Sequence, residues 1–182
     1  MVFRLETKRL LLRVPAAFDV PEIVTLIGDY DVAKNLSRVP YPYSEADAKG
    51  WVEKTAEARG KGTEYVFAIT RKDDDAYIGS CGLHKRDGAY FEFGYWLGKP
   101  FWGQGYATEA ARRLVAFAFM ELGMDTVIAG YFHDNPASGH VLEKLGCVPD
   151  GTGHRDCLSR GHAVYCHNVV LTRDNFWKKK AA

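Results

Sequence analysis

The sequence lacks the features of several protein classes. It has no apolar run long enough to cross a membrane, and its N-terminal stretch MVFRLETKRLLLR carries charges where a signal peptide would have an apolar core. Basic residues (24) and acidic residues (23) nearly balance, so no strong field of either sign favours nucleic acid or an anionic membrane. We therefore expect a cytoplasmic protein that binds neither nucleic acid nor membrane.

Cysteine is scarce, and the four cysteines form no CxxC pair, so a disulfide framework is not expected. One region faintly resembles zinc-ligand spacing, because it contains His154, Cys157, His162, Cys166 and His167. The same region is also typical of two strands around a Ser-Arg-Gly turn. Alternation would then place Cys166 and His167 on opposite faces. We therefore expect no metal site.

The chain has the size and composition of one globular domain. Its 182 residues are 47% hydrophobic and 26% charged, values that an average soluble domain shows. We predict a single domain over residues 1–182, with a tail that is frayed from about residue 174. The basic run of residues 178–180 falls in this tail.

Hydrophobic periodicity and turn residues predict an ordered series of elements. Strands are expected at 7–14, 64–71, 76–85, 89–97, 126–132, 151–157 and 162–172. Helices are expected at 21–27, 44–59, 108–122 and 135–145, with Asp19 and Asn135 as caps of the first and last. The order β-α-α-β-β-β-α-β-α-β-β predicts an α/β fold of the α+β type: a mixed, mostly antiparallel sheet of about seven strands flanked by about four helices.

A glycine turn between a strand and the longest helix is the clearest candidate site. Residues 102–107 (WGQGYA) open the helix, and free amides at a helix N-terminus favour an anion such as a phosphate. A Walker loop is excluded because no Lys-Ser or Lys-Thr follows. A dinucleotide fingerprint fits only half, since Thr108 replaces the third glycine and three strands precede the turn.

Five segments in order resemble the GCN5-related N-acetyltransferases, nearest the RimJ/RimL-like branch. They are 6–13 (ETKRLLLR), 94–97 (GYWL), 102–110 (WGQGYATEA), 135–138 (NPAS) and 142–146 (LEKLG). The resemblance implies an acetyl-CoA-dependent N-acetyltransferase. It also implies that the backbone of six turn residues holds the pyrophosphate: Gly103, Gln104, Gly105, Tyr106, Ala107 and Thr108.

The same resemblance implies how the rest of the cofactor is bound. The strand edge at Tyr95, Trp96 and Leu97 would pair with the pantetheine arm, and an N–H near Leu97 would face the thioester oxygen. Asn135 and Ser138 would contact the pantetheine or the leaving sulfur. Relatives often carry a tyrosine acid on the last helix, but Leu142 occupies that position here, so Ser138 becomes the candidate for this role.

The chemistry also needs a group that accepts the proton of the attacking amine. Glu92 is the candidate, because its strand turns Phe91 and Phe93 to the other face; His84, Glu109 and His133 are weaker candidates. We expect direct transfer of the acetyl group to a primary amine, in a protein N-terminus or a small molecule, within a ternary complex.

Two other functions are compatible with the sequence. The missing tyrosine would suit a degenerate, CoA-binding sensor without turnover, and the half-matched fingerprint leaves a nicotinamide-dependent oxidoreductase. The acceptor would lie among the first two helices and the last two strands. Homodimerisation through the C-terminal strands is compatible with the sequence as well.

Overall fold

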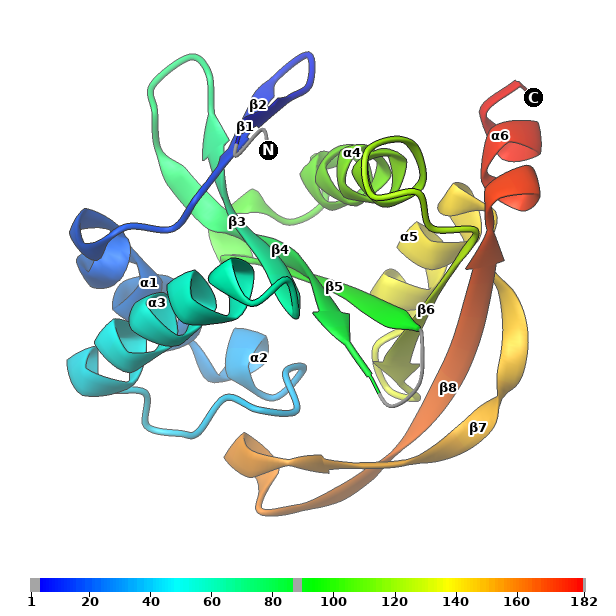
Figure 1. The fold of residues 1–182 in the computed structure, drawn as a ribbon. Coiled ribbons are helices and arrows are strands. Elements are labelled where there is room, and N and C mark those ends of the chain that lie inside the picture. Colours follow the sequence, from blue (N-terminus) through cyan, green and yellow to red (C-terminus); the bar gives the residue numbers. More distant parts are fainter. Residues whose placement is uncertain (1–3, 87–89, 182) are drawn as a thin grey trace.

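The computed structural model describes residues 4–86 and 90–181 and contains one eight-stranded mixed sheet in the order β1-β2-β3-β4-β5-β6-β8-β7 (Figure 1). Among the strands of these described residues, only β5 and β6 pair in parallel. The strands are β1 (Arg4–Glu6), β2 (Leu10–Arg13), β3 (Glu64–Arg71), β4 (Tyr77–Lys85), β5 (Phe91–Leu97), β6 (Thr126–Phe132), β7 (Val148–Cys157) and β8 (His162–Thr172).

Helices cover both faces of the sheet (Figure 1). The described residues form α1 (Val20–Ile27), α2 (Tyr30–Ala33), α3 (Glu45–Gly60), α4 (Tyr106–Met120), α5 (Pro136–Leu145) and α6 (Arg173–Ala181). The main core lies between the sheet and the α4–α5 side, and a smaller core lies beneath α1 and α3. The predicted fold class is therefore confirmed, with one more strand and two more helices than expected.

Strand β5 sorts its side chains between these two cores. Phe91, Phe93, Tyr95 and Leu97 belong to the core on the α4 side, whereas Trp96 packs in the smaller core. This is the alternation that every extended strand imposes. The prediction that Glu92 faces away from Phe91 and Phe93 is confirmed, and Glu92 lies on the side of the sheet that carries α1 and α3.

The differences from the predicted elements include the short helix α2, an earlier start of β7 at Val148 and the two ends of the chain. The strand expected at 7–14 is a hairpin, because the Leu10 amide donates to Thr7 Oγ1 (2.8 Å) and turns the chain between β1 and β2. The tail expected to fray is α6, which Phe176 anchors in the core at 1% exposure. In α3, Ala48 and Thr55 are buried, whereas Ala56 is exposed.

Asp19 holds an ion pair instead of capping α1 through its side chain. Its carboxylate accepts two hydrogen bonds from Arg13 (2.6 and 2.8 Å) and one from the Ala16 amide, and the side chain is 2% exposed. Removing one partner of a buried pair leaves the other charge uncompensated. Asp19 therefore ties β2 to the segment that leads into α1.

We expect Asp19→Ala to lower the free energy of unfolding by about 3 kcal/mol, because it strands the Arg13 guanidinium. Denaturant unfolding monitored by circular dichroism measures this. Glu6→Ala is the control: Glu6 pairs with Lys72 at the surface, where such pairs contribute little, and no measurable change is expected. Equal stability of the two variants would contradict the assigned role of Asp19.

Candidate active site

The sheet opens between β5 and β6, the pair of parallel strands. They pair only at Phe91↔Val127 and Glu92↔Ile128, so the rest of β5 has no partner strand on that side. The other edge of β5 is bonded to β4 along its whole length. The unpaired edge of β5 and the facing edge of β6 form a slot, which we call the β5–β6 slot.

Alternation decides which backbone groups of β5 face the β5–β6 slot. The Gly98 amide donates to Ile78 of β4 (2.9 Å), so the amides of Trp96 and Gly98 point to β4. The amides of Tyr95 and Leu97 then point to the slot. The Leu97 carbonyl faces the same way, and it accepts a hydrogen bond from Trp102 Nε1 (2.8 Å). Trp96 presents neither its amide nor its side chain to the slot.

The glycine turn opens α4 with two residues in the left-handed region. Gly103 and Gly105 have φ of +74° and +80°, a conformation that a Cβ atom disfavours. The first amide of the α4 ladder is that of Glu109, which donates to Gly105 O (3.1 Å). The amides of 106–108 precede that ladder and lie at the positive end of the helix dipole. The turn is therefore shaped to bind an anion.

The β1–β2 hairpin fastens this turn from the other end of the chain. Glu109 accepts hydrogen bonds from Thr7 Oγ1 (2.6 Å), the Arg9 amide (2.9 Å) and Arg9 Nε (2.7 Å). Burial alone would raise the pKa of Glu109, but these hydrogen bonds outweigh it and lower the pKa. Arg9 also donates to Gln104 O (3.0 Å) and lies over the Tyr106 ring, which adds a positive charge at the turn.

The N-terminus of α5 lies beside the β5–β6 slot. Asn135 is its cap, because its Oδ1 accepts the Ser138 amide (3.2 Å), and Pro136 takes the first helical position. The Ser138 hydroxyl lies 3.0 Å from the hydroxyl of Tyr95. The predicted cofactor residues on β5 and α5 are thus in contact. Leu142 is 2% exposed and packs in the core.

Glu92 lies on the opposite face of the sheet and is 7% exposed. Arg155 of β7 donates to its Oε1 and Arg86 to its Oε2 (2.6 Å), and Arg155 also donates to Asn168 Oδ1 (2.9 Å). Burial alone would raise the pKa of Glu92, but the hydrogen bonds and charges of Arg155 and Arg86 outweigh it and hold the pKa below its usual range. Glu92 is therefore ionised at neutral pH.

A glycine lets Arg155 reach Glu92 across β6. A Cβ atom at Gly130 would lie 2.7 Å from Arg155 Nη2, so the guanidinium passes directly over this residue. Sequence reasoning did not identify Arg155, the hydroxyl of Tyr95 or the charge of Arg9. Their partners lie 63, 43 and about 100 residues away, and no local pattern signals such contacts.

Of the three weaker proton-acceptor candidates, His84 lies beside Glu92, and the other two lie apart from it. His84 pairs with Glu92 in register between β4 and β5, and its Nδ1 lies 3.2 Å from Glu64 Oε1. His133 is exposed, and its Nδ1 lies 3.2 Å from the Tyr165 carbonyl oxygen. Glu109 is bound at the α4 turn, on the cofactor side.

The histidine and cysteine region divides between the two faces of β8, as the alternation predicted. Cys166 is buried with Phe132, Cys157 and Val164, whereas His167 stacks on Tyr131 (5.0 Å between ring centres) on the other face. In residues 4–86 and 90–181 there is no cluster of three or more side chains that could hold a metal ion.

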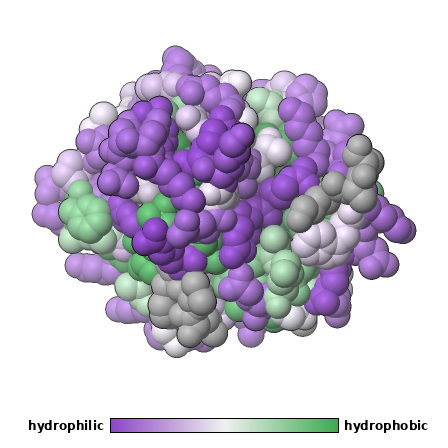
Figure 2. Space-filling model, turned by 90° about the horizontal axis from the view of Figure 1, so that it is seen from above, coloured by the Kyte–Doolittle hydropathy of each residue, from purple (hydrophilic) through white to green (hydrophobic). Residues whose placement is uncertain are grey.

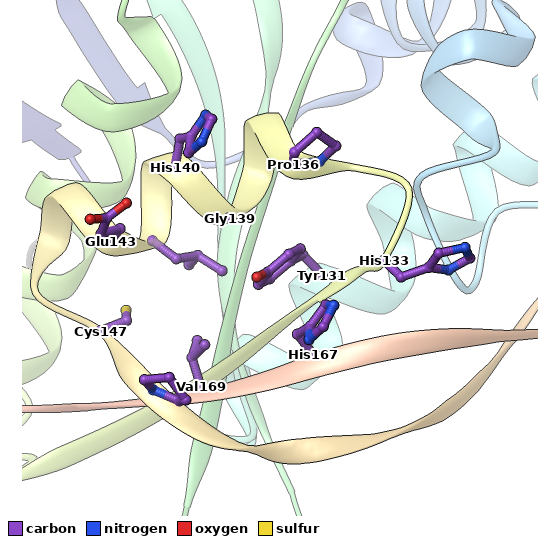
Figure 3. Close-up of a pocket in the computed structure, with 11 residues that line it drawn as sticks. Tyr131, His133, Pro136, Gly139, His140, Glu143, Cys147, His167 and Val169 are labelled. Carbon is purple, nitrogen blue, oxygen red and sulfur yellow. The ribbon is translucent and has the colours of Figure 1, made fainter.

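A pocket of about 340 Å³ lies between α5 and the strands β6, β7 and β8, and its lining is drawn in Figure 3. The stacked Tyr131 and His167 lie on its strand side, and His140 and Glu143 come from α5. Its lining also includes Leu142, which lies one helical turn after Ser138 in α5.

The surface shows no single large apolar area on the face drawn in Figure 2, where hydrophilic residues predominate and apolar ones form separate small patches. Within the described part of the chain, none of the helices has the length and apolar character needed to cross a membrane.

Comparison with known proteins identifies the class to which this fold and slot belong. The family model of the acetyltransferase (GNAT) domain matches residues 9–148, which is well over half of the chain. The chain belongs to the GNAT acetyltransferase family, and it is an N-acetyltransferase.

Individual proteins agree with this assignment. An uncharacterized N-acetyltransferase of Bacillus subtilis (strain 168), YnaD, is 28% identical over 172 residues, which cover 94% of this chain and 97% of that protein. The uncharacterized N-acetyltransferase p20 of Bacillus licheniformis is 28% identical over 149 residues, covering 81% and 83%. RimL, a ribosomal L7/L12 alpha-N-protein acetyltransferase solved with coenzyme A, has the same fold: the TM-score is 0.83 at 17% identity, covering 94% and 99%.

Proposed function

We propose that this chain transfers the acetyl group of acetyl-CoA to a primary amine by direct attack within a ternary complex. The observation that carries the proposal is the β5–β6 slot, which runs from the free amides of the α4 turn to the Tyr95–Ser138 contact. The family uses acetyl-CoA, in which the pantetheine arm joins the pyrophosphate of the nucleotide to the thioester.

The residues of the slot fit that molecule. Amides of Gly103, Gln104, Gly105, Tyr106, Ala107 and Thr108 would hold the pyrophosphate, with Arg9 adding charge. The Tyr95 and Leu97 backbone would pair with the pantetheine arm as a further strand does. Asn135 and Ser138 would lie beside the sulfur, because Ser138 contacts Tyr95 from the first turn of α5.

Each step of the transfer then has a protein group. Leu97 N–H stabilises the negative charge that builds on the thioester oxygen, an interaction that contributes on the order of 3 kcal/mol in acyl transfer. Glu92 receives the proton of the amine through water on the other face of the sheet. A carboxylate can accept about four hydrogen bonds, two on each oxygen. Arg155 occupies one position on Oε1 and Arg86 binds Oε2, so Oε1 can still accept a hydrogen bond from that water.

The amine would approach from the face that carries α1, α2 and α3, since Glu92 is on that face. A protein N-terminus and a small-molecule amine both fit this chemistry. The end of the β7–β8 hairpin borders this side, because Leu158 N–H donates to Ser37 O (3.1 Å) in the segment after α2. Cytoplasmic location and homodimerisation stay predictions.

Thiol release tests this function. The enzyme is given acetyl-CoA and a panel of peptides, amino acids, polyamines and aminoglycosides. We expect at least one amine to cause release of CoA thiol. Mass spectrometry should show that this amine has gained one acetyl group, about 42 Da. Acetyl-CoA binding without release by any amine would favour the sensor instead. Absence of binding would contradict both.

A further inference from the structure

We propose that Tyr95 is a positioning residue for the leaving group: its hydroxyl holds the Ser138 hydroxyl so that the serine proton points at the CoA sulfur. This inference rests on the proposed function. The resemblance described above assigns Tyr95 only a backbone role. The structure brings the Tyr95 side chain to the N-terminus of α5.

The contact joins two elements that the slot separates. Tyr95 lies on β5 and Ser138 in the first turn of α5, and their hydroxyl oxygens are 3.0 Å apart. The Tyr95 hydroxyl is also 3.2 Å from the Ser138 carbonyl oxygen. The Ser138 amide is already bonded to Asn135, which fixes the first turn of the helix. Tyr95 thus holds Ser138 from the strand and Asn135 holds it from the helix.

The number of hydroxyl protons decides whether the serine proton is free for the sulfur. The two hydroxyls carry one proton each, and the Ser138 carbonyl can only accept. When Tyr95 donates to Ser138 Oγ, the serine proton is free to point into the slot. When Tyr95 donates to the Ser138 carbonyl instead, Ser138 donates to Tyr95 and the serine proton is occupied. An anionic sulfur in the slot favours the first arrangement, because hydrogen bonds to ionised acceptors are roughly twice as strong.

Tyr95 keeps its own proton throughout. Burial raises the pKa of Tyr95 well above its usual value, since the ionised phenol would lose its hydration. The balance of the step is then simple. The amine lone pair forms the C–N bond, the C–S bonding pair leaves with sulfur, and the amine proton passes to Glu92 through water. Ser138 stabilises the thiolate by a hydrogen bond while Tyr95 supports Ser138.

A second tyrosine–serine pair provides a matched control. Tyr77 and Ser80 have hydroxyl oxygens 2.6 Å apart, and Tyr77 packs in the smaller core beneath α1 and α3. Tyr77→Phe removes the same kind of hydrogen bond on the other face of the sheet. It separates a role in the slot from the general effect of losing a buried hydroxyl.

The test titrates the thiol of bound CoA by thiolate absorbance and, in parallel, measures turnover. We expect Tyr95→Phe and Ser138→Ala to raise the thiol pKa by about one unit and Tyr77→Phe to leave it unchanged. Tyr95→Phe should lower kcat about tenfold without changing KM for acetyl-CoA. The double variant should match Ser138→Ala alone, because Tyr95 acts through Ser138.

Three outcomes decide the matter. An unchanged thiol pKa in Tyr95→Phe, or additive losses in the double variant, overturns the role of Tyr95. A shifted thiol pKa in a protein that acetylates no amine supports the role and contradicts the proposed function. Failure of the wild type to bind CoA overturns both.

Discussion

Gly105→Glu should abolish detectable acetyl-CoA binding. The new carboxylate would stand at the N-terminus of α4, where the amides of 106–108 are free for the pyrophosphate. Two like charges about 4 Å apart repel by about 4 kcal/mol at a protein surface, which corresponds to roughly a 1,000-fold loss of affinity. Isothermal titration calorimetry with acetyl-CoA measures this directly.

Two controls separate charge from backbone strain. Gly123→Glu makes the same substitution at another exposed glycine with positive φ (+70°), just after the C-terminal end of α4, and should bind normally. Gly105→Gln keeps the size of the side chain and the strain at φ +80° without the charge, and should lose much less affinity. If Gly105→Glu binds acetyl-CoA normally, the pyrophosphate does not bind at this turn.

Glu92→Gln should lower kcat about 100-fold and leave the KM for acetyl-CoA unchanged, as expected for loss of a proton acceptor. The amide oxygen can still accept a hydrogen bond from Arg155 or Arg86, but the amide has no charge and cannot take a proton. Asp19→Asn is the control, since Asp19 is likewise a buried carboxylate bound by an arginine, but it lies in the segment that leads into α1. If Glu92→Gln and wild type have equal kcat values, Glu92 is not the proton acceptor and its role is purely structural.

The pH dependence gives an independent check on Glu92. Because its folded-state pKa is lowered, Glu92 stays ionised as pH falls from 9 to about 6. The wild-type kcat/KM should therefore rise with pH as the amine loses its proton, without an inflection from Glu92. The same lowered pKa stabilises the folded state at neutral pH, and this contribution is lost when acid protonates the carboxylate. The free energy of unfolding of Glu92→Gln should therefore fall less than that of the wild type when the pH is lowered into the acid range.

The two faces of the sheet carry different parts of the reaction. Ser138 and Tyr95 lie with α4 and α5, where the cofactor residues are, whereas Glu92 lies with α1 and α3. The slot between β5 and β6 connects the two faces because the strands pair at only two positions. Cofactor and amine can thus meet from opposite sides.

Much of this arrangement was predictable from local signals. Apolar alternation placed the three-strand meander before the glycine turn, and the structure confirms β3, β4 and β5 in antiparallel register. The cap predicted at Asn135 is that of α5, and α3 begins where it was predicted, after Ser44, which forms a capping box. Each of these signals depends only on residues that are neighbours in the sequence, so each can be recognised without knowing how distant elements pack.

The contacts that complete the site were not predictable in this way. Arg155 binds Glu92 only because β7 folds back beside β8 and Gly130 leaves room above β6. Tyr95 reaches Ser138 only because α5 begins beside the unpaired edge of β5. Both contacts depend on how distant elements pack. The alternation of side chains along a strand predicts only which face of the sheet a side chain occupies, and not which residue it contacts.

A structure determined with CoA bound tests the central claim most directly. We expect the pyrophosphate on the amides of residues 103–108, the pantetheine arm along Tyr95 and Leu97, and the sulfur within hydrogen-bond distance of Ser138 Oγ. Coenzyme A bound outside the β5–β6 slot, or a slot that stays empty at saturating CoA, would contradict the account.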